Sequence, residues 1–354
     1  MNTVHVVLPA GTDDPARPSG GHVYNRRVCD GLAARWLVRE HPVAAPWPAV
    51  DPAADRRLAD ELRALPDAAV VLIDGLIATP AAAVVVPETR RLTILVVVHM
   101  PLGGNGSDRM SERERAMLAA AAGIITTSDW TRTHLLQSYG LPASAVVVAQ
   151  PGVDPAGRAA GTPTGGELLC VATLAPNKGH DVLLAALSAL TDLDWRCRLV
   201  GPPADDPRFV AGLRRQAGTG MLRGRLTFSG ALTARRLENA YARADLFVLA
   251  SRAETYGMVI TEALARGLPV ISTAVGGVPE ALGRTPDGRR PGLLVPPGNA
   301  GALGAALRRW LTDTDLRSQL RVAAGERREL LSGWDRTTQR VGSALAAAAG
   351  VGVP

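Results

Sequence analysis

Two glutamates eight residues apart, Glu254 and Glu262, are the residues whose types and spacing best indicate chemistry. Glu254 follows the apolar run Leu246–Ala250, which is typical of a strand, and Glu262 lies in the helix-like run Met258–Arg266. Ligands bind at the carboxyl ends of strands in open α/β sheets, and backbone N–H groups at a helix N-terminus attract anions. Since a carboxylate there can accept hydrogen bonds from hydroxyls, the pattern indicates a ligand that is both a polyol and a phosphate.

The two glutamates also allow plainer interpretations. Glu262 and Arg266 are spaced i,i+4 and could form a surface ion pair worth only about 0.3–0.5 kcal/mol. Glu254 could be an ordinary acidic residue near a helix start. On one ideal helix the two residues would be separated by about 12 Å along the axis, too far to flank one reacting bond. If Glu254 lies in the preceding loop instead, the pair suits the two ends of an extended ligand.

Lys178, the only lysine of the chain, lies in a segment that connects an expected strand to an expected helix. An ammonium beside a helix N-terminus can hold a pyrophosphate together with the free backbone N–H groups. A solvated lysine in a turn is the alternative interpretation. Lys178 therefore becomes a candidate anion ligand only in combination with other sites.

In the first half of the chain the candidates are Gly20, Gly21 and His99. Paired glycines before a helix let the backbone approach a ligand closely, although a plain turn would have the same pattern. The segment is not G-x-G-x-x-G and no acidic residue follows at the ribose-binding position, which disfavours a nicotinamide cofactor. His99 ends the apolar run Thr93–Val98 and precedes a glycine-rich loop, so it is either a catalytic group facing a ligand or a structural hydrogen-bonding group.

Length and composition predict two α/β domains without a membrane span. The chain has 354 residues, 47% of them hydrophobic, and its longest apolar region (68–87) is interrupted by Asp74, Gly75 and Pro80. The first apolar run is too short for a signal peptide, so we expect a cytoplasmic protein, or one peripheral to the membrane. Residues 1–150 carry a net charge of −1 (14 Arg, 15 acids) and the remainder +7 (25 basic, 18 acidic). The basic second half suits an anionic ligand, and the lack of basic runs argues against nucleic acid.

Short apolar runs alternate with helix-length amphipathic stretches, which is typical of α/β folds with parallel sheets covered on both faces. The Gly- and Pro-rich stretch 151–166 separates two such series, so we expect domains at 1–155 and 156–331, and a C-terminal helix at 332–354. A capping-box pattern, Ser111-Glu112-Arg113-Glu114, predicts that a helix begins there. The expected strands are Val4–Leu8, Val70–Ile73, Thr93–Val98, Gly123–Thr127, Leu168–Ala172, Arg196–Val200, Leu226–Ser229, Leu246–Ala250 and Pro269–Thr273. The expected helices include Val23–Arg35, Ser111–Ala122, Val182–Leu190, Leu237–Ala242, Thr312–Leu331 and Asp335–Ala348.

Taken in order, these motifs resemble the retaining glycosyltransferases of family four over nearly the whole chain. The specific part is the E-x7-E segment followed by Gly276-Gly277-Val278-Pro279-Glu280. The resemblance implies a GT-B architecture: two Rossmann-like, doubly wound parallel-sheet domains with a donor cleft between them. It also implies that the first domain is the acceptor side, that the second binds the nucleotide sugar, and that the last helix crosses back to the first domain. The supporting motifs are Ser19-Gly20-Gly21, Thr127-Ser128-Asp129-Trp130, Pro151-Gly152-Val153-Asp154, Lys178-Gly179 and Phe228-Ser229-Gly230.

The resemblance also implies a role for each candidate. Lys178 would neutralise the diphosphate, Glu254 would bind hydroxyls of the sugar, and Glu262 would bind the ribose hydroxyls. His99 would contact the transferred sugar. The other donor-binding positions would be Gly20 and Gly21 beside the phosphate and acceptor, Gly230 and Leu232 at the border of the base, Gly257 and Met258 through their N–H groups, and Thr173.

Thr173 is the main departure from the family pattern. The family often has Gly-Arg-Leu where this chain has Ala172-Thr173-Leu174, and the arginine normally shares the neutralisation of the phosphate with the lysine. Thr173 can donate a hydrogen bond but carries no charge. Either Lys178 acts alone, or another arginine supplies the charge, or the donor differs.

The function that the resemblance implies is transfer of a sugar from a nucleoside diphosphate sugar to a hydroxyl of a small molecule, glycan or lipid, with retention at the anomeric carbon. The resemblance also implies that no metal or other cofactor is needed. The metal-type patterns Asp192-Leu193-Asp194 and Asp313-Thr314-Asp315 do not follow strands, where a metal site would be expected. The three cysteines lack C-x-x-C spacing and are expected to be buried. Another GT-B nucleotide-sugar enzyme (an epimerase or a phosphorylase-like enzyme) and a non-catalytic nucleotide-sugar-binding subunit are the alternatives.

Overall fold

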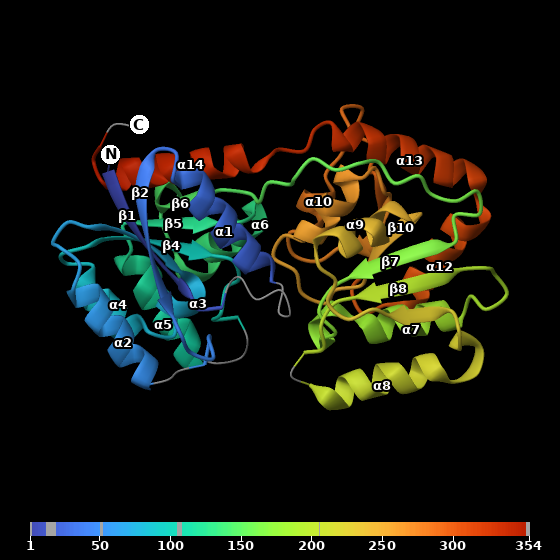
Figure 1. The fold of residues 1–354 in the computed structure, drawn as a ribbon, viewed down its shortest axis with the longest axis horizontal. Coiled ribbons are helices and arrows are strands. Elements are labelled where there is room, and N and C mark those ends of the chain that lie inside the picture. Colours follow the sequence, from blue (N-terminus) through green and yellow to red (C-terminus); the bar gives the residue numbers. More distant parts are fainter. Residues whose placement is uncertain (1, 12–18, 50–51, 105–107, 205, 352–354) are drawn as a thin grey trace. The chain divides into compact units, whose positions relative to one another are not determined.

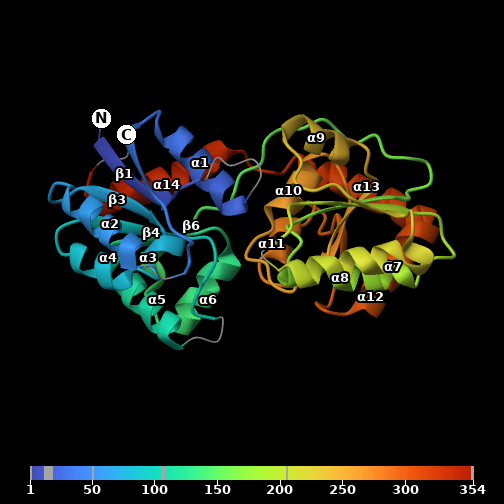
Figure 2. The same ribbon diagram turned by 60° about the horizontal axis from the view of Figure 1, so that its bottom comes forward.

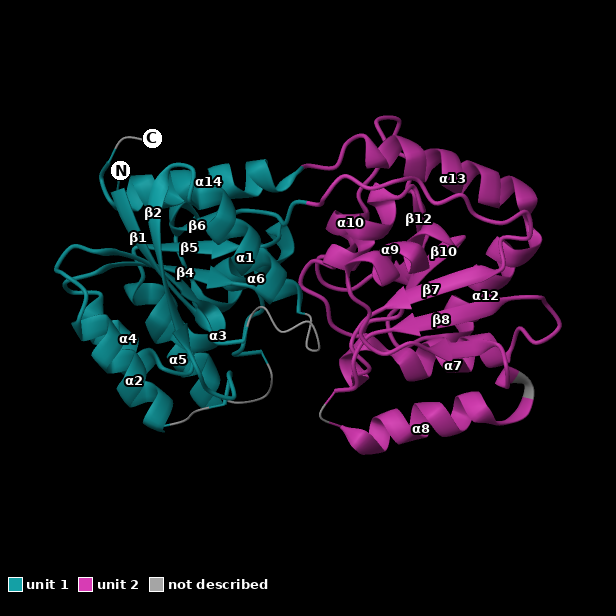
Figure 3. Ribbon diagram, viewed as in Figure 1, with its two compact units in different colours: residues 1–14, 19–152, 333–354 teal, residues 15–18, 153–332 magenta. Residues whose placement is uncertain are grey.

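The computed structural model describes residues 2–11, 19–49, 52–104, 108–204 and 206–351. These residues form two compact units (Figure 3). Unit 1 combines residues 2–11, 19–152 and 333–351, and unit 2 runs from Val153 to Ser332. The predicted domain boundaries, 155/156 and 331/332, lie close to these divisions.

Unit 1 is built around a parallel sheet with the strand order β2-β1-β3-β4-β5-β6 (Figure 1). Successive side chains of its central strands point to opposite faces, and both faces are buried: Val6 and Leu8 pack on one side and Val7 on the other. Burial on both faces explains the near-continuous apolar runs. The strands are β1 (Asn2–Pro9), β2 (Trp36–Val43), β3 (Val70–Asp74), β4 (Thr93–Val98), β5 (Gly123–Thr126) and β6 (Val146–Val148).

Helices cover both faces of the unit 1 sheet. Leu58 of α2, Val85 of α4 and Met117 of α5 pack in one apolar cluster, while Val28 of α1 and Val341 of α14 pack in the other. The helix α14 follows unit 2 in the sequence yet belongs to unit 1 (Figure 3). The helices are α1 (Gly20–Leu32), α2 (Pro52–Arg63), α3 (Gly75–Ala78), α4 (Ala82–Glu88), α5 (Asp108–Ala120), α6 (Asp129–Tyr139) and α14 (Trp334–Ala348).

Unit 2 repeats this plan with a second parallel sheet, whose strand order is β12-β11-β10-β7-β8-β9. The chain first builds outward from β7 to β9 and then continues in β10 on the other side of β7. The carboxyl ends of β7 and β10 therefore form a topological switch point, where the loops diverge and leave a crevice. The strands are β7 (Glu167–Val171), β8 (Arg196–Val200), β9 (Leu226–Phe228), β10 (Leu246–Leu249), β11 (Val270–Thr273) and β12 (Gly292–Val295).

The helices of unit 2 form a layer on each side of its sheet (Figures 1 and 2). Leu183 of α7, Leu213 of α8 and Leu307 of α12 share one apolar cluster, and Tyr241 of α9 and Ile260 of α10 share the other. The helices are α7 (His180–Ser188), α8 (Pro207–Gly218), α9 (Ala234–Ala242), α10 (Met258–Ala265), α11 (Val278–Leu282), α12 (Ala300–Thr312) and α13 (Thr314–Arg328).

The α/β class and the nine predicted strands are confirmed, with ends shifted by a residue or two in most cases. Three short or edge strands, β2, β6 and β12, were not predicted. The helix α1 begins at Gly20 instead of Val23, so Gly20 and Gly21 form its first turn. The capping-box prediction is wrong, because α5 begins at Asp108. The carboxylate of Glu114 instead accepts hydrogen bonds from the backbone N–H groups of residues 102 and 103, which ties the loop after β4 to α5.

Candidate functional site

Lys178 and Glu254 come from the two loops that flank the switch point of unit 2. Lys178 ends a short 3-10 helix, η2 (Pro176–Lys178), in the loop after β7, and Glu254 lies in the loop between β10 and α10. Because β7 and β10 are neighbouring strands, their loops meet at one edge of the sheet. Glu254 thus lies in the loop before α10 and not on the helix. The interpretation that the two glutamates reach the two ends of an extended ligand required this position.

The side chains of Lys178 and Glu254 form an ion pair, with Lys178 Nζ 2.6 Å from Glu254 Oε2. The lysine side chain is 25% exposed and the glutamate 13%, so both groups remain accessible to a ligand. The pair places a cation and a carboxylate side by side. A bound diphosphate would compete with the carboxylate for the ammonium, and the released carboxylate oxygen could accept hydrogen bonds from sugar hydroxyls.

Two glycines hold the backbone of this pair in place. Gly276 has a φ of +54°, and a Cβ there would lie 1.7 Å from the carbonyl oxygen of Glu254. Gly179 has a φ of +66°, and a Cβ there would lie 2.0 Å from the carbonyl oxygen of Ala250. Since only glycine permits both the left-handed φ and these approaches, the glycines of the two motifs fix the loops that carry Lys178 and Glu254.

Arg252 joins the two loops directly. Its guanidinium donates to both carboxylate oxygens of Asp181 at 2.8 and 2.6 Å and to the carbonyl of Pro176 at 2.7 Å. The backbone N–H of Arg252 also donates to the carbonyl of Asn177 at 2.7 Å. The hydrogen bond from the Arg252 guanidinium lowers the pKa of the Asp181 carboxyl group. Arg252 was not predicted from sequence, and it braces the turn that presents Lys178.

The N-terminus of α10 begins beside Glu254. Its N-cap residue, Gly257, has a left-handed backbone and offers no side chain to the first N–H groups, so those of Met258 and its neighbours can face an anion. The hydroxyl Oγ of Ser251 in the same loop is buried and has no hydrogen-bond partner in the part of the chain that the structure describes. Both features suit a loop that closes around polar groups of a ligand.

Glu262 is the fifth residue of α10 and has a partner that was not predicted from the sequence. The phenol of Tyr241, from α9, donates to Glu262 Oε2 at 2.9 Å. Burial raises the pKa of Glu262, while the hydrogen bond from Tyr241 opposes this rise. The alternative interpretation of Glu262, a surface ion pair with the Arg266 side chain, is not what the structure has: Arg266 pairs with Glu238 and donates to the backbone carbonyl of Glu262.

The remaining predicted positions of unit 2 are present in loops but make fewer contacts. Gly230 follows β9 with a φ of +65°, and its carbonyl accepts a hydrogen bond from Gly201 N at 2.9 Å. Leu232 packs against the apolar cluster that contains α10. The hydroxyl of Thr173 has no hydrogen-bond partner among the described residues. Thr173, which stands where the family often has an arginine, therefore has a hydroxyl that a ligand could contact.

In unit 1 the structure brings Gly21 and His99 together. A Cβ on Gly21 would lie 3.4 Å from the His99 ring, so the first turn of α1 packs against the residue that follows β4. The Tyr24 ring meets His99 edge-on at 5.1 Å between centroids. The imidazole contacts two further residues that were not predicted, Asn25 and Asp74. Burial lowers the pKa of His99, and the nearby Asp74 carboxylate opposes this effect.

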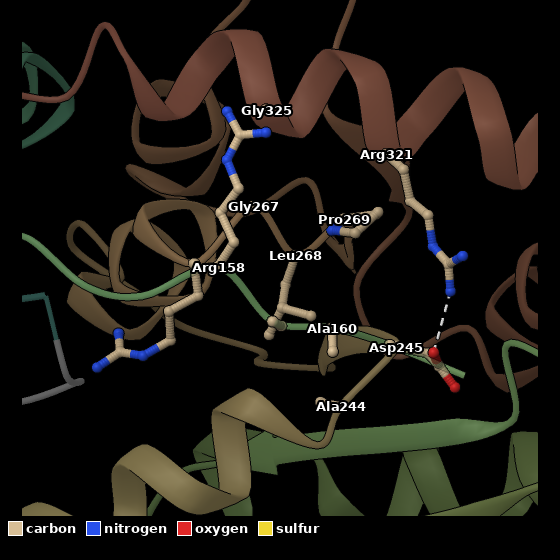
Figure 4. Close-up of a pocket in the computed structure, with 12 residues that line it drawn as sticks. Arg158, Ala160, Ala244, Asp245, Gly267, Leu268, Pro269, Arg321 and Gly325 are labelled. Carbon is tan, nitrogen blue, oxygen red and sulfur yellow. Dashed lines mark hydrogen bonds and ion pairs between the residues drawn. The ribbon is translucent and has the colours of Figure 1, made fainter. Parts of the chain in front are cut away.

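A separate pocket of about 160 Å³ lies in unit 2 and contains none of the predicted site residues (Figure 4). Its charges are already paired: Arg321 points to the buried Asp245 at 3.0 Å, and Arg158 lies 3.5 Å from Glu329. Asp245 also accepts the backbone N–H of Glu167 at 2.9 Å. These contacts tie residues near the start of unit 2 to its later part, and they give the pocket a structural role.

The two Asp-x-Asp patterns have structural partners. Asp192 pairs with Arg308 at 2.7 Å, and Asp313 caps α13 by accepting the N–H of Leu316 at 2.9 Å. No group of three His, Cys, Asp or Glu residues that could hold a metal occurs among the residues described. Within the same residues, no helix is both long and apolar enough to cross a bilayer.

Two family descriptions match the chain, each over one part of it. "Glycosyltransferase Family 4" matches residues 2–156, and "Glycosyl transferases group 1" matches residues 161–327. D-inositol 3-phosphate glycosyltransferase of Saccharomonospora viridis is 32% identical over 246 residues, which are 64% of this chain and 55% of that protein. The chain thus spans about half the length of the curated relatives it matches.

Two solved structures have the same fold. Sucrose-phosphate synthase from Thermosynechococcus elongatus has a TM-score of 0.76 at 20% identity, covering 97% of this chain and 98% of that one. HepE from Anabaena, solved in complex with UDP-glucose, has a TM-score of 0.75 at 18% identity, covering 98% and 100%. These likenesses confirm the predicted GT-B fold.

Proposed function

The chain belongs to the family-4-like glycosyltransferases, and from this we propose that it transfers a sugar from a nucleoside diphosphate sugar to an acceptor hydroxyl, with retention and without a metal. The observation that carries the proposal is the ion pair of Lys178 and Glu254 at the switch point of unit 2. A cation for the diphosphate and a carboxylate for sugar hydroxyls are the two groups that such a donor requires.

In the proposed reaction, the bond between the anomeric carbon and the diphosphate oxygen breaks. Lys178 and the free N–H groups at the start of α10 stabilise the charge that grows on the leaving diphosphate. The acceptor oxygen forms its bond on the same face of the sugar, and its proton passes to the leaving phosphate oxygen. Glu254 and His99 hold the transferred sugar, and Glu262 holds the ribose.

We propose a polyol, glycan or lipid headgroup as the acceptor. The relative from Saccharomonospora viridis is named for its action on D-inositol 3-phosphate, so this polyol phosphate is the first acceptor to test. HepE was solved with UDP-glucose, so UDP-glucose is the first donor. Thr173 stands where the family often has an arginine, and the proposal assigns the neutralisation of the phosphate to Lys178 with the helix N-terminus.

The test begins with a thermal-shift panel of UDP, GDP, ADP and dTDP and their sugars, because a ligand that binds the folded state raises the melting temperature. Transfer is then measured with the donor that stabilises most, with and without EDTA, and the anomeric configuration of the product is read by NMR. Loss of a group that stabilises transition-state charge costs about 10²–10³-fold in rate. We expect a loss of this size for Lys178→Ala. Glu254→Ala should also lower the rate of transfer, because it removes the carboxylate that holds the transferred sugar.

Arg214→Ala, at an exposed position of α8, is the matched control and should keep wild-type transfer. Wild-type rates in Lys178→Ala and Glu254→Ala would show that these residues do not have the proposed roles. Nucleotide binding without transfer or donor hydrolysis across the acceptor panel would identify a non-catalytic nucleotide-sugar-binding protein. A product formed from the donor alone would instead indicate an epimerase.

A further inference from the structure

The carboxamide of Asn25 lies between Asp74 and His99 inside unit 1. Its Nδ2 is 2.6 Å from Asp74 Oδ2, and its Oδ1 is 2.9 Å from His99 Nε2. Asn25 is on α1, Asp74 ends β3, and His99 directly follows the neighbouring strand β4. The side chains of Asn25 and Asp74 are nearly inaccessible to solvent, so the three groups can satisfy one another only in a defined arrangement.

The donors and acceptors in this chain of contacts follow from chemistry. A carboxylate accepts hydrogen bonds, so the amide NH₂ of Asn25 must face Asp74 and the amide oxygen must face His99. Because the amide oxygen also only accepts, Nε2 of His99 must carry a hydrogen. The other neutral tautomer would place two lone pairs against each other at 2.9 Å. The second oxygen of Asp74 accepts Leu76 N at 2.8 Å, which fixes the carboxylate itself.

The other groups around the ring favour the neutral imidazole. Burial lowers the pKa of His99, His22 acts in the same direction, and Asp74 opposes both. In a neutral ring with its hydrogen on Nε2, Nδ1 has a free lone pair. Among the residues that the structure describes, Nδ1 of His99 has no hydrogen-bond partner, and this atom is not fully buried.

We propose that Asn25, held by Asp74, fixes His99 as the Nε2–H tautomer, so that Nδ1 accepts a hydrogen bond from a hydroxyl of the transferred sugar. Asn25 and Asp74 are positioning residues, since they act through His99. The hydrogen bond from the sugar to Nδ1 rests on the proposed function, in which His99 contacts the sugar. The assignment of the tautomer does not rest on it. The arrangement favours a neutral, hydrogen-donating group at this position over a carboxylate, because the lone pair of Nδ1 would repel an anion.

The tautomer is measured by two-bond ¹H–¹⁵N correlation NMR on the full chain labelled at its six histidines. The His99→Gln spectrum identifies the His99 signals by their disappearance. We expect the wild type at pH 7.5 to give the pattern of a single Nε2–H tautomer. A neutral Nδ1–H pattern or an imidazolium pattern would overturn the proposal. His99→Gln serves only to assign the signals, and the tautomer is read from the wild type, in which the buried cluster is intact.

Asn25→Ser then tests whether Asn25 sets the tautomer. We expect its His99 signals to change to a mixture of tautomers, and the catalytic efficiency with the donor to fall about tenfold, as for loss of one hydrogen bond near 1.4 kcal/mol. Asp30→Asn, at an exposed position of the same helix, should match the wild type in both readouts. An unchanged His99 pattern in Asn25→Ser would refute the role of Asn25. Absence of transfer with every donor, combined with the Nε2–H pattern in the wild type, would refute the proposed function and leave the tautomer assignment in place.

Discussion

Tyr241→Phe removes one oxygen from unit 2 and leaves the buried ring in place. In the wild type this oxygen donates to Glu262 at 2.9 Å, and Arg266 lies over the ring, 4.3 Å from its centroid. A hydrogen bond to a charged group contributes about 1.5–3 kcal/mol. The substitution leaves the Glu262 carboxylate without this donor, so we expect the free energy of unfolding to fall by at least about this amount when Glu262 is ionised.

The sign of the pH dependence follows from Glu262. Burial raises its pKa in the folded protein, and the hydrogen bond from Tyr241 limits that rise. A carboxyl group whose pKa is raised on folding binds its proton more tightly in the folded state, so its contribution becomes more favourable as the pH falls. Loss of the Tyr241 hydroxyl raises the pKa further and destabilises only the ionised form. The destabilisation by Tyr241→Phe should therefore be largest at high pH, where Glu262 is ionised, and shrink as the pH falls and Glu262 becomes protonated.

Urea unfolding of wild type and Tyr241→Phe at pH 8 and pH 5 measures this difference. Tyr256→Phe is the matched control, because Tyr256 is a buried tyrosine of the same unit without a hydrogen-bonded hydroxyl among the described residues. If Glu262 holds the ribose, Tyr241→Phe should also reduce the preference for a nucleoside diphosphate over its 2′-deoxy form. Equal destabilisation at both pH values, together with unchanged ribose discrimination, would mean that Tyr241 only fills space and would refute the reasoning.

Three further substitutions test the loops of unit 2. Gly276→Ala forces a Cβ against the carbonyl of Glu254, so urea unfolding should show a loss above about 2 kcal/mol; a stable variant with normal donor binding would contradict the packing argument. Arg252→Ala breaks the ion pair of Arg252 with Asp181, whose side chains are 39% and 42% exposed, so the free energy of unfolding should change by less than about 1 kcal/mol. Because the turn that carries Lys178 loses this contact, calorimetry should nevertheless show weaker binding of a nucleoside diphosphate. Thr173→Arg restores the charge of the family pattern and should strengthen the binding of a nucleoside diphosphate. Added salt should reduce this gain in affinity, because it screens the new charge; an unchanged affinity would mean that Thr173 lies away from the phosphate.

The strands that are buried on both faces were predictable because burial leaves a continuous apolar run. The strand β4 was predicted with both ends correct, Thr93 and Val98. The strand β2 was missed because it lies at the sheet edge and carries the exposed charges of Arg39 and Glu40. A polar interruption in a strand at the surface resembles a loop when only the sequence is considered.

The site was predictable where a motif keeps its residues close in sequence, and not where partners come from distant elements. Lys178 and Glu254 were identified by motif order, but their direct contact depends on the pairing of β7 with β10. Asp74 directly follows the predicted strand Val70–Ile73, which was a usable signal for a residue at the ligand edge. The pairing of Asn25 with it depends on how α1 packs over the sheet, and spacing alone does not encode that packing.

The position of α14 in the chain has a consequence for biosynthesis. Val341, Leu345 and Ala346 of this helix are fully buried in the same cluster as residues of α1 and β1. A ribosome makes the N-terminal domain first, yet it adds these three side chains only after all of unit 2 has been made. Unit 1 consequently leaves the ribosome with an open apolar face, and the later domain can complete its core before the earlier one does.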